Sequence, residues 1–313
     1  MPVIHYQQWG EGDPLIALHP LALESSAFTG VGAHLANLGI RTLACDLPGF
    51  GKTPTIEGPL TPAALAEPVI RLARSLERPP ILLGMSLGGR VALEVALQAP
   101  ESVRGLVLIA PYLPWRRYHQ LNRMARFLDP QWGHRLPLER LWPLLKFSTI
   151  ALEGLPALEH DWLARACVRV AYYSTCPDTR VAFLSAAREL ALDPAVGESA
   201  LWERLRELRM PTSWLWAGRD RLIPRSHAAA VVERMPHSGQ FEAPCSGHFV
   251  NFRHYRCMEQ AIGLAVAHVL DVEAGRALGD PVRRVACLRG RGRGRARTGE
   301  SEETTAVALL GPG

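Results

Sequence analysis

The first 111 residues alternate short apolar runs with segments whose apolar residues recur every three or four positions. The apolar runs predict strands at residues 3–9, 15–18, 41–44, 81–83 and 103–109. The helical pattern is clearest over residues 62–76, where Leu65, Val69, Leu72 and Leu76 fall at spacings of four, three and four. Fully apolar strands that alternate with helices are typical of a parallel sheet with both faces covered. This part of the chain therefore predicts an α/β core.

The alternation stops at Pro111. Residues 112–210 contain helical segments interrupted by proline and no good strand, whereas strands return at 212–217 and 239–243. A last amphipathic helix is predicted over about 255–272. The simplest organisation is one α/β core, formed by residues 1–111 and 211–278, with a helical cap inserted as residues 112–210. The length of 313 residues suits one core with an insertion.

Composition supports a globular chain, with 48% hydrophobic and 21% charged residues. The net charge of +5 is uneven: residues 279–313 hold seven arginines and four acidic residues, which leaves +2 for the body. This tail alternates arginine with glycine over residues 289–295, so it cannot bury apolar surface, and we expect it to be disordered. It also lacks the aromatic residues that stack on bases, so nucleic acid is not an expected partner.

No segment suggests a membrane or a secreted location. The N-terminus has no basic start followed by an apolar core, and the apolar stretch from Ala261 to Leu270 is about half the length that spans a bilayer. We therefore expect a cytoplasmic protein with no membrane partner.

The segment Gly84-Met85-Ser86-Leu87-Gly88 matches G-x-S-x-G and lies between an apolar strand and an alanine-rich helix. That context is the one a nucleophile elbow requires, because the serine sits on a sharp turn where flanking glycines admit neighbouring backbone. The following helix directs its N-terminus at the site, which favours negative charge on the attacked group. Ser86 is therefore the candidate nucleophile.

A serine nucleophile needs a base, and the base needs an acid that orients it. Asp220 comes just after the strand at 212–217, and His248 follows the strand at 239–243. The carboxyl ends of parallel strands meet at one edge of a sheet, so we expect these side chains to lie beside Ser86. The competing interpretations are that Asp220 caps a turn or helix and that another histidine is the base.

Acyl transfer also requires two donors for the oxyanion. The residue after the nucleophile, Leu87, should supply one backbone N–H. The loop after the second strand, His19-Pro20-Leu21-Ala22, should supply the other, and Leu21 is the candidate because Pro20 has no N–H. We expect His19 to hold this loop rather than transfer protons.

Taken in order, these motifs resemble the α/β-hydrolase superfamily, in particular its esterase and lactonase-like members with a helical cap. The segment from Asp46 to Thr53, with sequence DLPGFGKT, is similar to the D-x-P-G-x-G-x-S loop of that family. The chain departs from the family at Pro20, where glycine is usual, and at Thr53, where serine is usual. The resemblance covers residues 1–111 and 211–270 and implies an α/β-hydrolase fold with a mostly parallel central sheet.

The resemblance implies a serine hydrolase that cleaves a carboxylic ester, lactone or thioester through an acyl-enzyme on Ser86. The alternative is other chemistry on the same fold: a C–C bond hydrolase, a lyase, or a cofactor-free perhydrolase or haloperoxidase-like enzyme. No dinucleotide or phosphate loop and no cluster at metal-ligand spacing is present, so no cofactor is expected. The partner is a small acyl substrate; its identity and the oligomeric state stay open.

Overall fold

The computed structural model describes residues 3–114, 127–135, 176–198, 200–220, 222–223, 225–244, 246–248, 256–276 and 282–284. Its strands are β1 (Tyr6–Trp9), β2 (Asp13–Leu18), β3 (Ile40–Cys45), β4 (Ile81–Met85), β5 (Gly105–Ile109), β6 (Thr212–Ala217), β7 (Gly239–Ala243) and β8 (Val282–Arg284). Its α-helices are α1 (Thr29–Ala36), α2 (Pro62–Ser75), α3 (Leu87–Gln98), α7 (Pro177–Leu192), α8 (Leu201–Arg204), α9 (His227–Arg234) and α10 (Arg256–Glu273).

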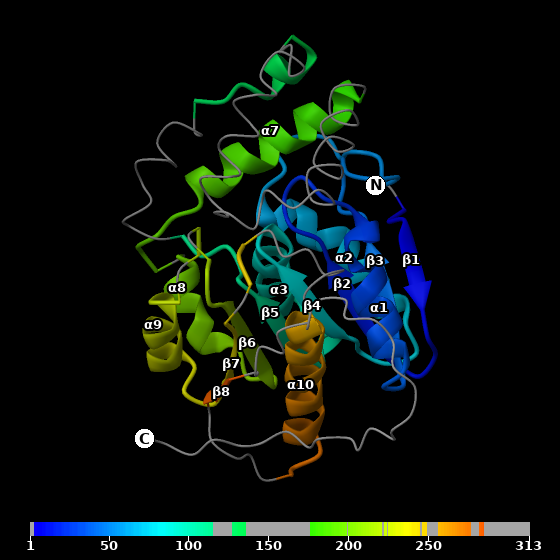
Figure 1. Ribbon diagram of the computed structural model, residues 1–313. Helices are drawn as coiled ribbons and strands as arrows, with labels where there is room; N and C mark the ends of the chain where they lie inside the picture. The colour runs from blue at the N-terminus through cyan, green and yellow to red at the C-terminus, as the bar shows by residue number, and fades with distance from the viewer. Residues whose placement is uncertain are drawn as a thin grey trace, which may run out of the picture.

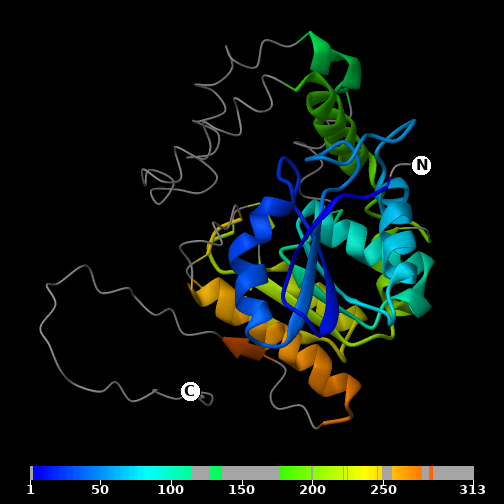
Figure 2. The same ribbon diagram turned by 90° about the vertical axis from the view of Figure 1, so that its right-hand side faces the viewer.

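The described strands form one sheet in the order β1-β3-β2-β4-β5-β6-β7-β8. Only β1 pairs antiparallel in this sheet, and the remaining pairings are parallel. The predicted mostly parallel α/β sheet is therefore confirmed. Figures 1 and 2 show α1 and α10 on one face of the sheet and α2 and α3 on the other.

Alternation along each strand divides the core into two layers. In β5, Leu106 and Leu108 pack in the layer that contains α2 and α3, whereas Val107 and Ile109 pack in the layer that contains α1 and α10. Because successive strand residues point to opposite faces, a strand buried on both sides must be apolar throughout. This explains why β4 and β5, which are buried along their whole length, appear in the sequence as continuous apolar runs.

Three features differ from the sequence-based expectation. The first strand begins at Tyr6 rather than residue 3, and the helix α9, between β6 and β7, was not predicted. The tail prediction is wrong for Val282–Arg284, which form β8 beside β7. Without β8, the outer edge of β7 would present unpaired N–H and C=O groups, and an extended segment can pair with such an edge whatever its hydropathy. The rest of the predicted disordered tail lies outside the described residues.

Helical structure also dominates the described part of the predicted cap. It contains a 3-10 helix over Pro130–His134, then α7 and α8, and no strand in residues 112–114, 127–135, 176–198 or 200–210. Helix α7 lies beyond the carboxyl ends of the parallel strands (Figure 1). The remaining residues of the cap prediction lie outside the described parts of the chain.

Candidate active site

Ser86 lies on the turn between β4 and α3 with a left-handed backbone conformation, φ 50° and ψ −113°. A non-glycine residue there costs about 1–3 kcal/mol, so the surrounding structure must hold it. The Ser86 N–H donates to the carbonyl oxygen of Ile109 at 3.1 Å. Its own carbonyl accepts the N–H groups of Arg90, at 3.0 Å, and Tyr112, at 2.9 Å. These bonds fix the elbow from both neighbouring elements.

The glycines of the motif are required by close backbone contacts. A Cβ on Gly88 would lie 2.0 Å from the carbonyl oxygen of Leu18, and one on Gly84 would lie 2.4 Å from the carbonyl oxygen of Gly88. Real atoms cannot approach so closely, and the obstacles are backbone atoms of buried elements. The G-x-S-x-G spacing therefore reflects the packing of the elbow against β2.

The structure brings Ser86, His248 and Asp220 together. His248 Nε2 lies 3.1 Å from Ser86 Oγ, and His248 Nδ1 lies 2.8 Å from Asp220 Oδ2. The other oxygen of Asp220 accepts the N–H groups of Leu222, at 2.8 Å, and Ile223, at 2.7 Å. A carboxylate can only accept a hydrogen bond, so the imidazole proton is assigned to Nδ1, which faces Asp220. Nε2, which faces the serine, is then a hydrogen-bond acceptor.

These three side chains are shielded from water. The exposed fraction is 8% for Ser86, 8% for Asp220 and 2% for His248. Electrostatic interactions and hydrogen bonds are stronger in such a site than in bulk water. The arrangement can therefore move a proton from the serine hydroxyl to the imidazole while the buried carboxylate stabilises the resulting cation.

The two predicted oxyanion donors lie at the predicted places in the chain. Leu87 is the first residue of α3, where an N–H has no partner within its own helix. Leu21 lies in the loop after β2, next to Ala22, which has φ 67°. Within the described residues, neither N–H donates a hydrogen bond to another group.

His19 holds the loop that carries Leu21. Its Nε2 accepts the N–H of Leu47 at 3.0 Å, so Nδ1 carries the proton and donates to the carbonyl oxygen of Pro20 at 2.9 Å. The imidazole is fully buried. It therefore acts as a neutral structural link between this loop and the loop after β3.

The loop after β3 is built around the buried carboxylate of Asp46. Burial alone would raise the pKa of Asp46, but the N–H groups of Lys52 and Ser25 and the His5 imidazole donate to it, and the net pKa is lowered. A Cβ on Gly51 would lie 2.3 Å from that carboxyl carbon, and the φ of Gly51 is +55°. The D-x-P-G-x-G pattern is therefore a loop folded around its own aspartate.

His227, which begins α9, is one of the histidines that do not follow a strand and a glycine as His248 does. Its imidazole is buried against the edge of the Trp202 ring, and burial lowers its pKa from 6.5 to about 4, although the charge of Asp220 opposes this shift. His227 is therefore neutral at pH 7. No motif in the sequence marks it, because it becomes notable only when α8 and α9 pack together.

The profile of the alpha/beta hydrolase family matches residues 15–259. Several curated relatives are named pimeloyl-[acyl-carrier protein] methyl ester esterase. The one from Shewanella woodyi is 39% identical over 258 residues, which is 78% of this chain and 90% of the relative. One from Xanthomonas oryzae pv. oryzae is 28% identical over 269 residues, 85% of this chain and all of the relative.

Solved structures agree in fold. An esterase from Thermogutta terrifontis superposes with a TM-score of 0.69 and 22% identity, over 85% of this chain and 93% of that one. A bromoperoxidase from Bacillus anthracis superposes with a TM-score of 0.65 and 16% identity, over 86% of this chain and 95% of that one. At these identities the likeness extends to the fold alone.

The chain belongs to the alpha/beta hydrolase family. It is an ester-cleaving enzyme whose fold is that of the serine hydrolases. No helix in the described ranges is long and apolar enough to cross a membrane. The same ranges contain no group of three His, Cys, Asp or Glu side chains that could hold a metal ion.

Proposed function

We propose that Ser86 is the nucleophile, His248 the general base and Asp220 the acid that orients it. The observation that carries this proposal is the position of His248, within hydrogen-bond distance of both Ser86 Oγ and Asp220 Oδ2. The order Ser, Asp, His along the chain is that of α/β-hydrolases. We further propose that the N–H groups of Leu21 and Leu87 form the oxyanion hole.

The reaction then has two halves. Ser86 Oγ bonds to the ester carbonyl carbon as its proton passes to His248 Nε2, and the carbonyl oxygen becomes an oxyanion held by the two N–H groups. The C–O bond to the alcohol breaks, and the alcohol leaves with the proton from His248. Water then attacks the acyl-serine with His248 as base, which releases the acid and restores the serine.

We infer that the substrate is the methyl ester of an acyl group carried on an acyl carrier protein. The names of relatives that align over most of this chain support this inference. Residues 112–210, which follow β5 and precede β6, are proposed as the cap over the site, because α7 lies beyond the strand ends. A cytoplasmic location stays a prediction.

The test combines labelling and turnover. Wild type should react covalently with a fluorophosphonate and hydrolyse a short aryl ester, and Ser86→Ala should do neither. Methanol release from pimeloyl-[acyl-carrier protein] methyl ester should exceed that from free dimethyl pimelate. Equal activity of wild type and Ser86→Ala would refute the nucleophile assignment, and equal rates on the two methyl esters would refute the carrier-bound substrate.

A further inference from the structure

The two residues that hold the carbonyl of Ser86 also contact the end of α7. Arg90 and Tyr112 donate their backbone N–H groups to Ser86. The Arg90 guanidinium donates from Nε to Asp193 Oδ2 at 2.6 Å and from Nη2 to Asp193 Oδ1 at 3.3 Å. The Tyr112 hydroxyl donates to the carbonyl oxygen of Leu190 at 2.7 Å. Leu190 lies in the last turn of α7 and Asp193 directly follows that helix.

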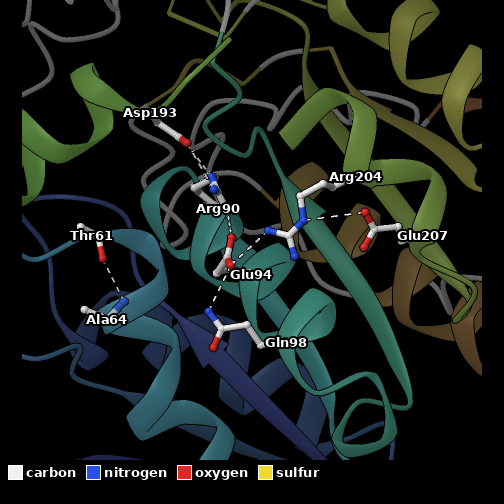
Figure 3. A network of polar contacts seen from close by, with 8 residues as sticks. All are labelled: Thr61, Ala64, Arg90, Glu94, Gln98, Asp193, Arg204 and Glu207. Carbon is white, nitrogen blue, oxygen red and sulfur yellow. Dashed lines mark hydrogen bonds and ion pairs between the residues drawn. The ribbon is translucent and has the colours of Figure 1, made fainter. Parts of the chain in front are cut away.

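The Arg90 contact belongs to a buried network of charges (Figure 3). Arg90 Nη1 also donates to Glu94 at 2.8 Å, and Glu94 accepts from Arg204 of α8 at 3.4 Å. The side chains of Arg90, Glu94 and Asp193 are each 7% exposed. Arg90 lies between the carboxylates of Glu94 and Asp193, and Arg204 pairs both with Glu94 and with the exposed Glu207, so each buried charge has a partner of opposite sign.

Such a network adds little net stability, because desolvation of the charges offsets their attraction, but its geometry is restrictive. A guanidinium bound to both oxygens of a carboxylate fixes distance and orientation together. Asp193 and Arg90 are 103 residues apart in the chain, so their contact fixes the distance between the elbow helix α3 and the end of α7.

Helix α7 also contacts the loops at the carboxyl edge of the sheet. A Cβ on Gly49 would lie 2.4 Å from the Cβ of Ala182, and the Leu60 N–H donates to Ser185 Oγ at 3.0 Å. Ala182, Ala186 and Leu190 of α7 belong to the core cluster that includes Leu87, and Leu21 packs against the same cluster. These contacts hold α7 against the loops that carry Gly49 and Leu60.

We propose that Asp193 and Tyr112 are positioning residues that hold α7 at a fixed distance from Ser86, and so set how well the site accepts a long acyl chain. This inference rests on the proposed function. The position of Ser86 itself does not depend on these two side chains, because Gly88 packs on the Leu18 carbonyl and the Ser86 N–H bonds to Ile109. Loosening α7 should therefore change substrate fit and leave the chemical step intact.

The experiment compares Asp193→Asn and Tyr112→Phe with a matched control, Asp178→Asn, whose aspartate is exposed in the first turn of α7. For p-nitrophenyl octanoate, KM should rise by about threefold or more in the first two variants, the order expected for one lost hydrogen bond. For p-nitrophenyl acetate, kcat and KM should stay within about twofold, or roughly 0.4 kcal/mol, because the Ser86 N–H is held by Ile109 and not by either side chain. The rate of fluorophosphonate labelling should match wild type, and the control should behave as wild type throughout.

Asp193→Asn leaves excess positive charge beside Arg90 and is the variant at risk of misfolding. Tyr112→Phe adds no buried charge and decides the matter if the first variant fails to fold. The inference would be overturned if folded variants showed the same change in KM for both esters, or no change in KM for the octanoate. Labelling of wild type would still support the proposed function in that case. Absence of labelling in wild type would instead overturn the proposed function, and this inference with it.

Discussion

Asp220→Asn tests the orienting role of the carboxylate. The substitution exchanges one carboxylate oxygen for an NH₂ group and changes the shape of the side chain very little. The N–H groups of Leu222 and Ile223 both donate to Oδ1, so the asparagine oxygen must occupy that position. The NH₂ group then faces His248 Nδ1, where the carboxylate oxygen accepted a hydrogen bond before.

An amide that donates to Nδ1 forces the imidazole proton onto Nε2. Nε2 lies 3.1 Å from Ser86 Oγ and, once protonated, can no longer accept the serine proton. We therefore expect kcat to fall by about 10³- to 10⁴-fold, or roughly 4–5.5 kcal/mol of barrier, the size of the effect known for a wrong tautomer in a serine protease triad. KM should change little, because the side chain of Asp220 is fully buried behind the histidine.

The assay is steady-state hydrolysis of a short aryl ester at saturating substrate, together with the second-order rate of fluorophosphonate labelling. Both rates should fall in parallel in Asp220→Asn and should be absent in Ser86→Ala. The exposed Asp178→Asn variant serves as the control for the same chemical change. A folded Asp220→Asn enzyme that keeps more than about a tenth of wild-type kcat would refute the tautomer argument.

Three further predictions concern stability. In Gly88→Ala the new Cβ would lie 2.0 Å from the Leu18 carbonyl oxygen, so urea denaturation should show that the free energy of unfolding falls by about 3 kcal/mol or more. The control is Gly263→Ala, whose Cβ meets only the far ends of flexible side chains and should leave stability nearly unchanged. Burial lowers the pKa of His227 from 6.5 to about 4, so the unfolded chain binds more protons than the folded one between these pH values. The free energy of unfolding should therefore fall as pH drops through this window. A His227→Phe variant with the same pH dependence as wild type would contradict this. The lowered pKa of Asp46 means that its ionised carboxylate stabilises the fold above pH 3.8, and this stabilisation is lost as pH falls below that value. Asp46→Asn should therefore flatten the acid side of a plot of unfolding free energy against pH. An unchanged acid side would contradict this prediction.

Most of the core could be predicted because its signals are local. A strand buried on both faces is largely apolar, and the continuous apolar runs at β4 and β5 show this directly. The elbow is equally local, since Gly84 and Gly88 flank a turn that no side chain could enter. The places of Asp220 and His248 at strand ends followed from the topology of a parallel sheet.

Other features could not be predicted because they depend on contacts between distant segments. The helix α9 has only eight residues, too few for their spacing to mark a helix clearly, and it packs through Val231 and the His227 ring. The strand β8 forms only because β7 offers it an edge. In the sequence, Arg90 and Asp193 are two charged residues among many, and nothing near either one indicates its partner.

The sequence by itself determined the class of sheet, the position of the elbow and the identity of the three candidate catalytic side chains, because each depends on the backbone and burial of its own segment. Only the tertiary structure decided the distances among Ser86, His248 and Asp220, the neutral state of His227 and the contact that ties α7 to α3. Those properties arise when segments far apart in the chain exclude water from one another. Burial, pKa and hydrogen-bond geometry acquire their values only then.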